Sequence, residues 1–161
     1  MSIDVDTYKQ VLGSWATGVT IVTARCGDRI HGMTVSAFTE VSLDPPLVLV
    51  CADKTSTTHA LIAEGGVFAV NLLASDQEDL SNRFASKKTE SNRFEGLEVE
   101  SARTGAPILA GTLGALDCRV VTAHDSGDHV LYIGEVQEVR VSDREPLLYF
   151  RGSYGAFAPR G

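Results

Sequence analysis

A group of hydroxyl side chains around one lysine, in the segment KTSTTH at residues 54–59, has the composition of an anion-binding site. The segment follows an apolar run, residues 47–51, and directly precedes a helix-like sequence, HALIAE. A loop between a strand and a helix start presents free backbone N–H groups at the positive end of the helix dipole. Such a loop predicts a phosphate site, although a hydroxyl-rich helix cap with a solvated lysine explains the same residues. A nucleotide triphosphate P-loop is excluded, because the glycine it requires before the lysine is missing.

Two histidines, His124 and His129, frame the turn-like sequence DSGD at residues 125–128. Two imidazoles and two carboxylates are conceivable metal ligands. However, side chains around a hairpin turn point in different directions, and no third histidine is clustered with them. We therefore predict a turn and no metal site. No partner can be assigned to His31 or His59 from the sequence.

The elements that position these residues are predominantly strands. Apolar and β-branched runs predict strands at residues 19–24, 30–37, 39–43, 47–51, 67–73, 130–141 and 147–150, with further strand sequence from residue 112. Because the strands come in runs rather than alternating with helices, a parallel nucleotide-binding sheet is disfavoured. A closed antiparallel barrel is favoured, since closure removes exposed edges. A change of apolar parity near Val136 predicts either a bulge in its strand or a bend of the strand out of a barrel.

Short helices are predicted between the strands. Amphipathic spacing predicts a helix over residues 4–15, and Ser56 is a plausible cap for a helix over residues 57–64. A capping box at residues 75–78 predicts a third helix. Residues 87–100 are polar and predict a loop with a turn of helix.

Composition limits the class of protein. A chain of 161 residues is most simply a single domain, residues 1–161, and its net charge of −7 argues against a general nucleic-acid binder. No apolar run approaches the ~20 residues of a membrane-spanning helix, and the N-terminus is not signal-like. Three widely spaced cysteines favour reduced thiols. We therefore expect a cytoplasmic protein. In an acidic chain an anionic ligand must be attracted by local cations, of which the candidates are Lys54, Arg83, Arg93 and Arg151.

Taken together, several segments resemble the short-chain flavin reductases, which supply reduced flavin to two-component flavin monooxygenases. The matching segments are GVTIVT (18–23), TVSA (34–37), VSLDPP (41–46), KTSTTH (54–59), GDH (127–129) and GEV (134–136). The resemblance covers nearly the whole chain, from Tyr8 to Tyr154. It implies a mainly β fold, the Greek-key split β-barrel of the FMN-binding type, usually as a homodimer.

The resemblance also implies a set of flavin-binding residues. The phosphate contacts would come from Ala52, Asp53, Lys54, Ser56, Thr57 and Thr58. The edge of the isoalloxazine ring would lie along Thr34, Val35, Ser36 and Ala37, with Ser42 acting from the next strand. The helix end formed by Arg83, Phe84 and Ala85 would border the flavin with the arginine near the phosphate, although the negative end of the helix dipole also explains that cation.

For the nicotinamide, the resemblance places His129 at the reacting face of the flavin, and this is the predicted catalytic residue. Arg151 and Tyr154 would help to hold the dinucleotide, although Tyr154 is equally explained as packing of the C-terminal tail.

The predicted function is an NAD(P)H-dependent flavin reductase, which passes a hydride from NADH or NADPH to FMN or FAD and supplies reduced flavin to a separate oxygenase. The two ring systems carry this chemistry, so the protein has only to stack them in the right orientation. The lack of a convincing triad or carboxylate pair is consistent with that role. Two alternatives are a flavin-binding carrier or electron-transfer protein without turnover, and a structural barrel that binds no flavin.

Overall fold

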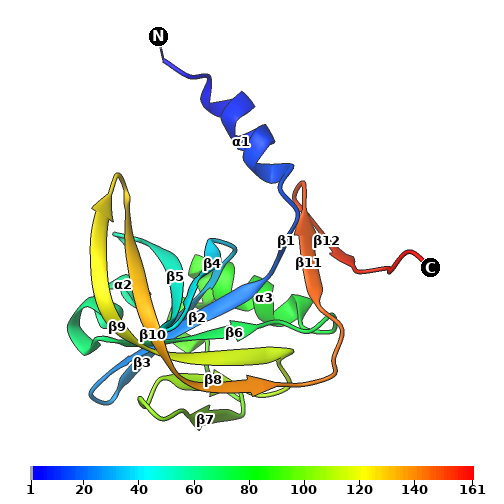
Figure 1. Cartoon of the computed structure of the whole chain (residues 1–161). Coiled ribbons are helices and arrows are strands. Elements are labelled where there is room, and N and C mark those ends of the chain that lie inside the picture. Colours follow the sequence, from blue (N-terminus) through cyan, green and yellow to red (C-terminus); the bar gives the residue numbers. More distant parts are fainter. Residues whose placement is uncertain (1) are drawn as a thin grey trace.

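The computed structural model describes residues 2–161 and consists mainly of antiparallel strands (Figure 1). Seven strands form one sheet in the order β3-β2-β6-β9-β10-β5-β4. Their bounds are β2 Thr20–Cys26, β3 Arg29–Val35, β4 Phe38–Leu43, β5 Pro46–Asp53, β6 Val67–Leu72, β9 Gly114–Ser126 and β10 His129–Val141. The sheet encloses a core that includes Val22, Val50, Phe68, Val70 and Cys118. The expected run of apolar strands is therefore confirmed, with small differences at the strand ends.

The sheet forms a split barrel because its two edge strands, β3 and β4, are not paired in a ladder within residues 2–161. Instead, Ser36 and Ala37 connect them. The Phe38 N–H donates to the Ser36 carbonyl at 3.0 Å, and the Cys51 N–H donates to the Ala37 carbonyl at 3.1 Å. The mainly β split-barrel prediction is confirmed, and the barrel does not close fully because this short connection replaces the last ladder.

Two smaller sheets complete the strand set. β1 (Thr17–Gly18), β11 (Leu147–Phe150) and β12 (Ser153–Ala156) form one sheet, and β7 (Val99–Ser101) pairs with β8 (Pro107–Leu109) in the other. Only β11 among these was predicted as a strand. β1, β7 and β8 have only two or three residues, and β12 (SYGA) lacks the apolar run that identifies β11 (LLYF).

Within residues 2–161, one short helix, α1 (Val5–Gly13), precedes the first strand, and three helical segments lie between strands: α2 (Thr57–Gly65), α3 (Glu78–Ala85) and the 3₁₀ helix η1 (Lys87–Asn92). The predicted cap of α2 is confirmed, since the Ser56 hydroxyl accepts a hydrogen bond from the His59 N–H at 3.1 Å. The helix ends at Gly66, whose φ of 68° is left-handed. Among the described residues, no helix is long and apolar enough to cross a membrane.

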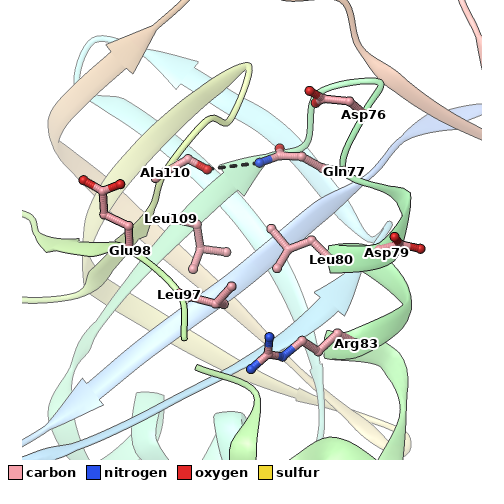
Figure 2. A pocket seen from close by; sticks show the side chains of 9 residues that line it. All are labelled: Asp76, Gln77, Asp79, Leu80, Arg83, Leu97, Glu98, Leu109 and Ala110. Atoms are coloured by element: carbon pink, nitrogen blue, oxygen red, sulfur yellow. Dashed lines mark hydrogen bonds between the residues drawn. The ribbon is translucent and has the colours of Figure 1, made fainter. Parts of the chain in front are cut away.

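The predicted capping box at residues 75–78 is wrong. Gln77 occupies the N-cap position of α3, and no side chain there caps the helix. The Gln77 amide instead accepts from the Ala74 N–H at 2.9 Å. It also donates to the Ala110 carbonyl at 3.0 Å, the hydrogen bond drawn in Figure 2. Tertiary contacts thus replace the local pattern that the sequence suggested.

The bulge expected near Val136 is confirmed, because the β9–β10 register shifts between Ile133 and Gly134 and again between Val136 and Glu138. Gly134 packs directly against the core. A Cβ at this position would lie 2.5 Å from the Phe68 ring and 2.8 Å from the Cys118 Cβ. Close packing, rather than a ligand contact, therefore explains the glycine of the GEV segment.

Replacing Gly134 with alanine is expected to lower the free energy of unfolding by about 1–3 kcal/mol, because an overpacked core must shift to accept the methyl group. Urea denaturation measures this change. Gly155→Ala is the matched control, since a Cβ there would meet nothing within 4 Å. Equal losses in the two variants would contradict the packing explanation.

Candidate functional site

The outer face of β5 carries the candidate site. Val48, Val50 and Ala52 point into the barrel core and are buried, whereas the alternating residues Leu49 and Cys51 are partly exposed. Asp53 ends the strand on this outer face. Its neighbour on β10 is His129, so the same strip of surface reaches the start of β10.

A groove of about 600 Å³ opens over Leu49 and Cys51. One wall is formed by residues 36–39, and the other by the end of α1 with Trp15 and by Tyr149 of β11. Its volume lies in the range of small-molecule sites, about 300–1,000 Å³. The groove therefore has the size and the largely apolar lining that a planar aromatic ligand requires.

The predicted ring-edge residues divide into two groups. Ser36 and Ala37 are exposed and line the groove. Thr34 is turned away, because its hydroxyl donates to the Ser81 carbonyl at 2.6 Å, and Val35 is buried in the core. Ser42 lies opposite Leu47, near the other end of β5 from Asp53. The structure thus brings Ser36 and Ala37 together in the groove, while the roles of the other three stay predictions.

The loop after β5 is held by its own polar groups. Asp53, the last residue of β5, accepts hydrogen bonds from the hydroxyl and N–H of Thr55, each at 2.7 Å, and these bonds lower the pKa of the Asp53 carboxyl. The Lys54 ammonium lies 2.5 Å from the Asp125 carboxylate and donates to the Gly127 carbonyl at 2.8 Å. Lys54 thus ties the loop to the β9–β10 hairpin. To reach a phosphate, the lysine would have to exchange these partners.

The N-terminus of α2 faces η1. The hydroxyl of Thr57, the first residue of α2, is exposed and donates to the Glu90 carboxylate at 2.8 Å. The next residue, Thr58, is fully buried, and its hydroxyl lies 2.8 Å from His31 Nδ1. Of the predicted phosphate contacts, Thr57 is exposed, whereas Thr58 and Ala52 are buried, and their contacts with a phosphate stay predictions.

His31 and Glu90 are residues of this region that sequence reasoning did not assign. The only signal for His31 is that it is a histidine within the predicted strand at residues 30–37. Its neighbours Thr58 and Glu90 are 27 and 59 residues away in sequence, so no motif connects them. His59, the other unassigned histidine, lies with its Nδ1 2.8 Å from the Tyr132 hydroxyl.

His129 lies at the end of the strip, 2.7 Å from the Asp128 carboxylate through Nδ1. That hydrogen bond lowers the pKa of the Asp128 carboxyl and orients the imidazole. The His129 side chain is 42% exposed, so a ligand on the strip could reach it. His124 occupies the same hairpin, and residues 2–161 contain no cluster of three His, Cys, Asp or Glu side chains arranged to hold a metal ion.

Arg83 lines a different hollow, of about 350 Å³, between α3 and the segment that follows η1. Figure 2 shows its guanidinium below three leucines, Leu80, Leu97 and Leu109. The guanidinium donates to the carbonyls of Asn92 at 2.7 Å and Glu95 at 2.5 Å, so it fixes the chain after η1.

The two residues that follow Arg83 differ in exposure. Phe84 is fully buried and packs edge-on against Phe94, whereas Ala85 is exposed. A flavin contact for this helix end remains a prediction.

The two C-terminal candidates do not line the groove. The Tyr154 hydroxyl bonds to Ser81 and Asn82 of α3, and its ring packs edge-on against Tyr149, which lines the groove. The Arg151 guanidinium stacks over the Phe150 ring at 4.9 Å, and the Arg151 backbone N–H donates to the carbonyl of Gly13. The proposed contacts of Arg151 and Tyr154 with a dinucleotide remain predictions.

Residues 12–158 match the family model described as the flavin reductase like domain. The chain is 41% identical over 153 residues to the FMN reductase (NADH) SmoA of Agrobacterium fabrum, covering 94% of this chain and 86% of that protein. It is 39% identical over 160 residues to the flavin-dependent monooxygenase reductase subunit HsaB of Mycobacterium tuberculosis, covering 98% and 84%. The fold is similar to a solved structure of the Streptomyces globisporus C-1027 NADH:FAD oxidoreductase SgcE6 in complex with NAD and FAD fragments. The TM-score is 0.89 and the sequence identity is 35%, over 97% of this chain and 94% of that chain.

Proposed function

Because this chain belongs to the flavin reductase-like family, we propose that it is an NADH-dependent flavin reductase that reduces FMN or FAD and supplies the reduced flavin to a separate oxygenase. The observation that carries this proposal is the family match over residues 12–158. It agrees with the names of the relatives, which are an FMN reductase (NADH), an NADH:FAD oxidoreductase and the reductase subunit of a flavin-dependent monooxygenase. The family expected from the sequence motifs is confirmed.

The residues on the outer face of β5 fit a flavin. The groove over Leu49 and Cys51 takes the ring, with Ser36 and Ala37 along one edge. From Leu49 to Asp53 the strand extends four residues, or ~13 Å, and it leads to the N-terminus of α2, where Thr57 faces the tail. When bound, the flavin supplies the ring that accepts the hydride. The protein's contribution is to orient that ring and leave room for the nicotinamide.

Replacing His129 with alanine is expected to lower kcat/KM for NADH by about tenfold and to leave the flavin Kd unchanged, because one hydrogen bond of about 1.4 kcal/mol to the dinucleotide would be lost. Steady-state kinetics and a flavin titration measure the two quantities. His124→Ala, on the same hairpin, is the control. A larger effect on flavin binding than on NADH use would show that the role of His129 is wrongly assigned.

The proposed function is tested by NADH and NADPH oxidation with FMN, with FAD and without flavin. We expect oxidation of NADH only when a flavin is added. Oxidation without flavin, or none with any combination, would contradict the proposal. A protein that keeps its yellow colour through gel filtration and is not bleached by NADH would instead be a flavin carrier.

We also propose that the protein is a homodimer whose subunits meet through α1. Figure 1 shows α1 extending away from the barrel, and no residue of this helix is buried. Its apolar residues and the tryptophan that follows it are 53–77% exposed: Val5, Tyr8, Val11, Leu12 and Trp15. An exposed apolar row of this size is typical of a surface that a partner covers. A second copy of the chain is the partner we propose.

Two further proposals concern organisation and location. Residues 1–161 form a single domain, because one seven-stranded sheet joins segments from most of the chain.

The protein works in the cytoplasm, which is a compartment where the free cysteines Cys26, Cys51 and Cys118 stay reduced. Burial raises the pKa of the Cys118 thiol to about 12, so this cysteine is an inert part of the core.

A further inference from the structure

Glu90 of η1 occupies a position with the properties of an anion site. Its carboxylate accepts a hydrogen bond from the Thr57 hydroxyl at 2.8 Å, and His31 Nε2 lies 3.8 Å from the same oxygen. Thr57 is the first residue of α2, so the carboxylate lies at the positive end of a helix of nine residues. The helix start that the sequence assigns to a phosphate is thus already in contact with an anion from the chain itself.

The polar and basic surroundings of Glu90 favour its charged form. The pKa of the Glu90 carboxyl is lowered by the hydrogen bond from Thr57 and by the charges of Arg93, His31 and Lys87. His31 comes from β3, Lys87 opens η1, and Arg93 follows η1. Lys87 and Arg93 line the hollow beside Glu90 together with a second acidic residue, Glu95, so the lining holds two cations as well as two carboxylates.

Two of these basic groups each have one nitrogen that lacks a hydrogen-bond partner. His31 is 8% exposed and Arg93 is 6% exposed, yet His31 Nε2 and Arg93 Nε are buried without a partner. The rest of the Arg93 guanidinium donates to the carbonyls of Gly32 at 2.7 Å and Ser86 at 3.0 Å. A buried polar group without a partner is costly, and it commonly marks a place where a ligand binds.

A phosphoryl group can accept more hydrogen bonds from these basic groups than the Glu90 carboxylate can. A phosphate monoester carries about −1.5 to −2 charges and three acceptor oxygens, whereas a carboxylate carries one charge on two oxygens. A hollow of about 840 Å³ adjoins the site and is lined by His31, Thr57, Lys87 and residues 90–95. There is therefore room for a ligand next to the carboxylate, or in place of it.

We propose that Glu90 is a displaceable internal occupant of this site, and that the phosphoryl group of the flavin tail replaces it at Thr57, His31, Lys87 and Arg93. The identity of the ligand rests on the proposed function. Because Glu90 competes with the phosphoryl group, the apparent affinity for flavin is reduced by the fraction of molecules in which the carboxylate holds the site. Glu90 lies on a six-residue 3₁₀ helix, so its release requires only a local movement.

The test is Glu90→Gln, which removes the negative charge and keeps an oxygen that can accept from Thr57. We expect the Kd for FMN, which is a phosphate monoester, to fall by about three- to tenfold, and the Kd for riboflavin, which has no phosphoryl group, to stay unchanged. Glu98→Gln is the matched control, because it makes the same charge change in the hollow of Figure 2. We expect it to alter no Kd.

Four results would overturn the proposal: an unchanged Kd for FMN, weaker FMN binding, equal tightening of riboflavin, or equal tightening by Glu98→Gln.

A second measurement does not depend on flavin. Inorganic phosphate should raise the Tm of Glu90→Gln more than that of the wild type. Equal shifts in Tm would also overturn the proposal. A larger phosphate shift in a protein that binds no flavin would support the anion site and contradict the proposed function.

Discussion

Replacing both Leu12 and Trp15 with serine is expected to raise the dimer dissociation constant by about a thousandfold. The two side chains are 55% and 77% exposed within one chain, so a partner that covers them gains their burial. In a twofold dimer four side chains are affected. At about 1 kcal/mol for each partly exposed side chain, the loss is about 4 kcal/mol, which corresponds to about three powers of ten.

The same change is expected to weaken flavin binding, because Leu12 and Trp15 line the groove over β5. Sedimentation across a range of protein concentrations measures the dimer, and a flavin titration measures the groove. Asp6→Asn combined with Lys9→Gln is the control, since it changes polar residues of the same helix. A wild-type protein that is monomeric at all concentrations, or a variant that dimerises as well as the wild type, would contradict the proposed interface.

Replacing Asn71 with alanine is expected to lower the free energy of unfolding by about 3 kcal/mol, because several buried polar groups would lose their partner. Asn71 is fully buried on β6. Its amide donates to the Ile21 carbonyl and the Thr23 hydroxyl, each at 3.1 Å, and accepts from the Leu109 N–H at 2.9 Å. It thus connects the main sheet to β8, which closes one side of the core.

Thermal unfolding measures this effect. For a chain of this size, about 3 kcal/mol corresponds to a fall in Tm of about 6–12 °C. Asn92→Ala is the control, because Asn92 is exposed. A fall of less than about 1 kcal/mol for Asn71→Ala would show that the network contributes little to stability.

The parts of the fold that depend on local pattern could be predicted from the sequence. The strand β11, the cap at Ser56 and the bulge near Val136 follow from residue type and spacing within a few positions. The capping box at residues 75–78 could not be excluded in this way. Its failure depends on Ala110, which is 33 residues from Gln77 in sequence and lies next to it only in the folded chain.

The candidate site was predictable in outline but not in its contacts. The loop at residues 54–59 identifies an anion site, yet the sequence does not reveal that Lys54 is paired with Asp125 or that Thr57 faces Glu90. These pairings join residues 33 to 71 positions apart. His31 is hidden for the same reason, since its polar neighbours belong to α2 and η1.

A crystal structure of the protein with oxidised FMN is the most direct test of the central claim. We predict the ring in the groove beside Ser36 and Ala37, with one ring face open to a nicotinamide, and the phosphoryl group within hydrogen-bond distance of Thr57. A phosphoryl group bound away from the N-terminus of α2, or a ring covered by protein on both faces, would contradict the account.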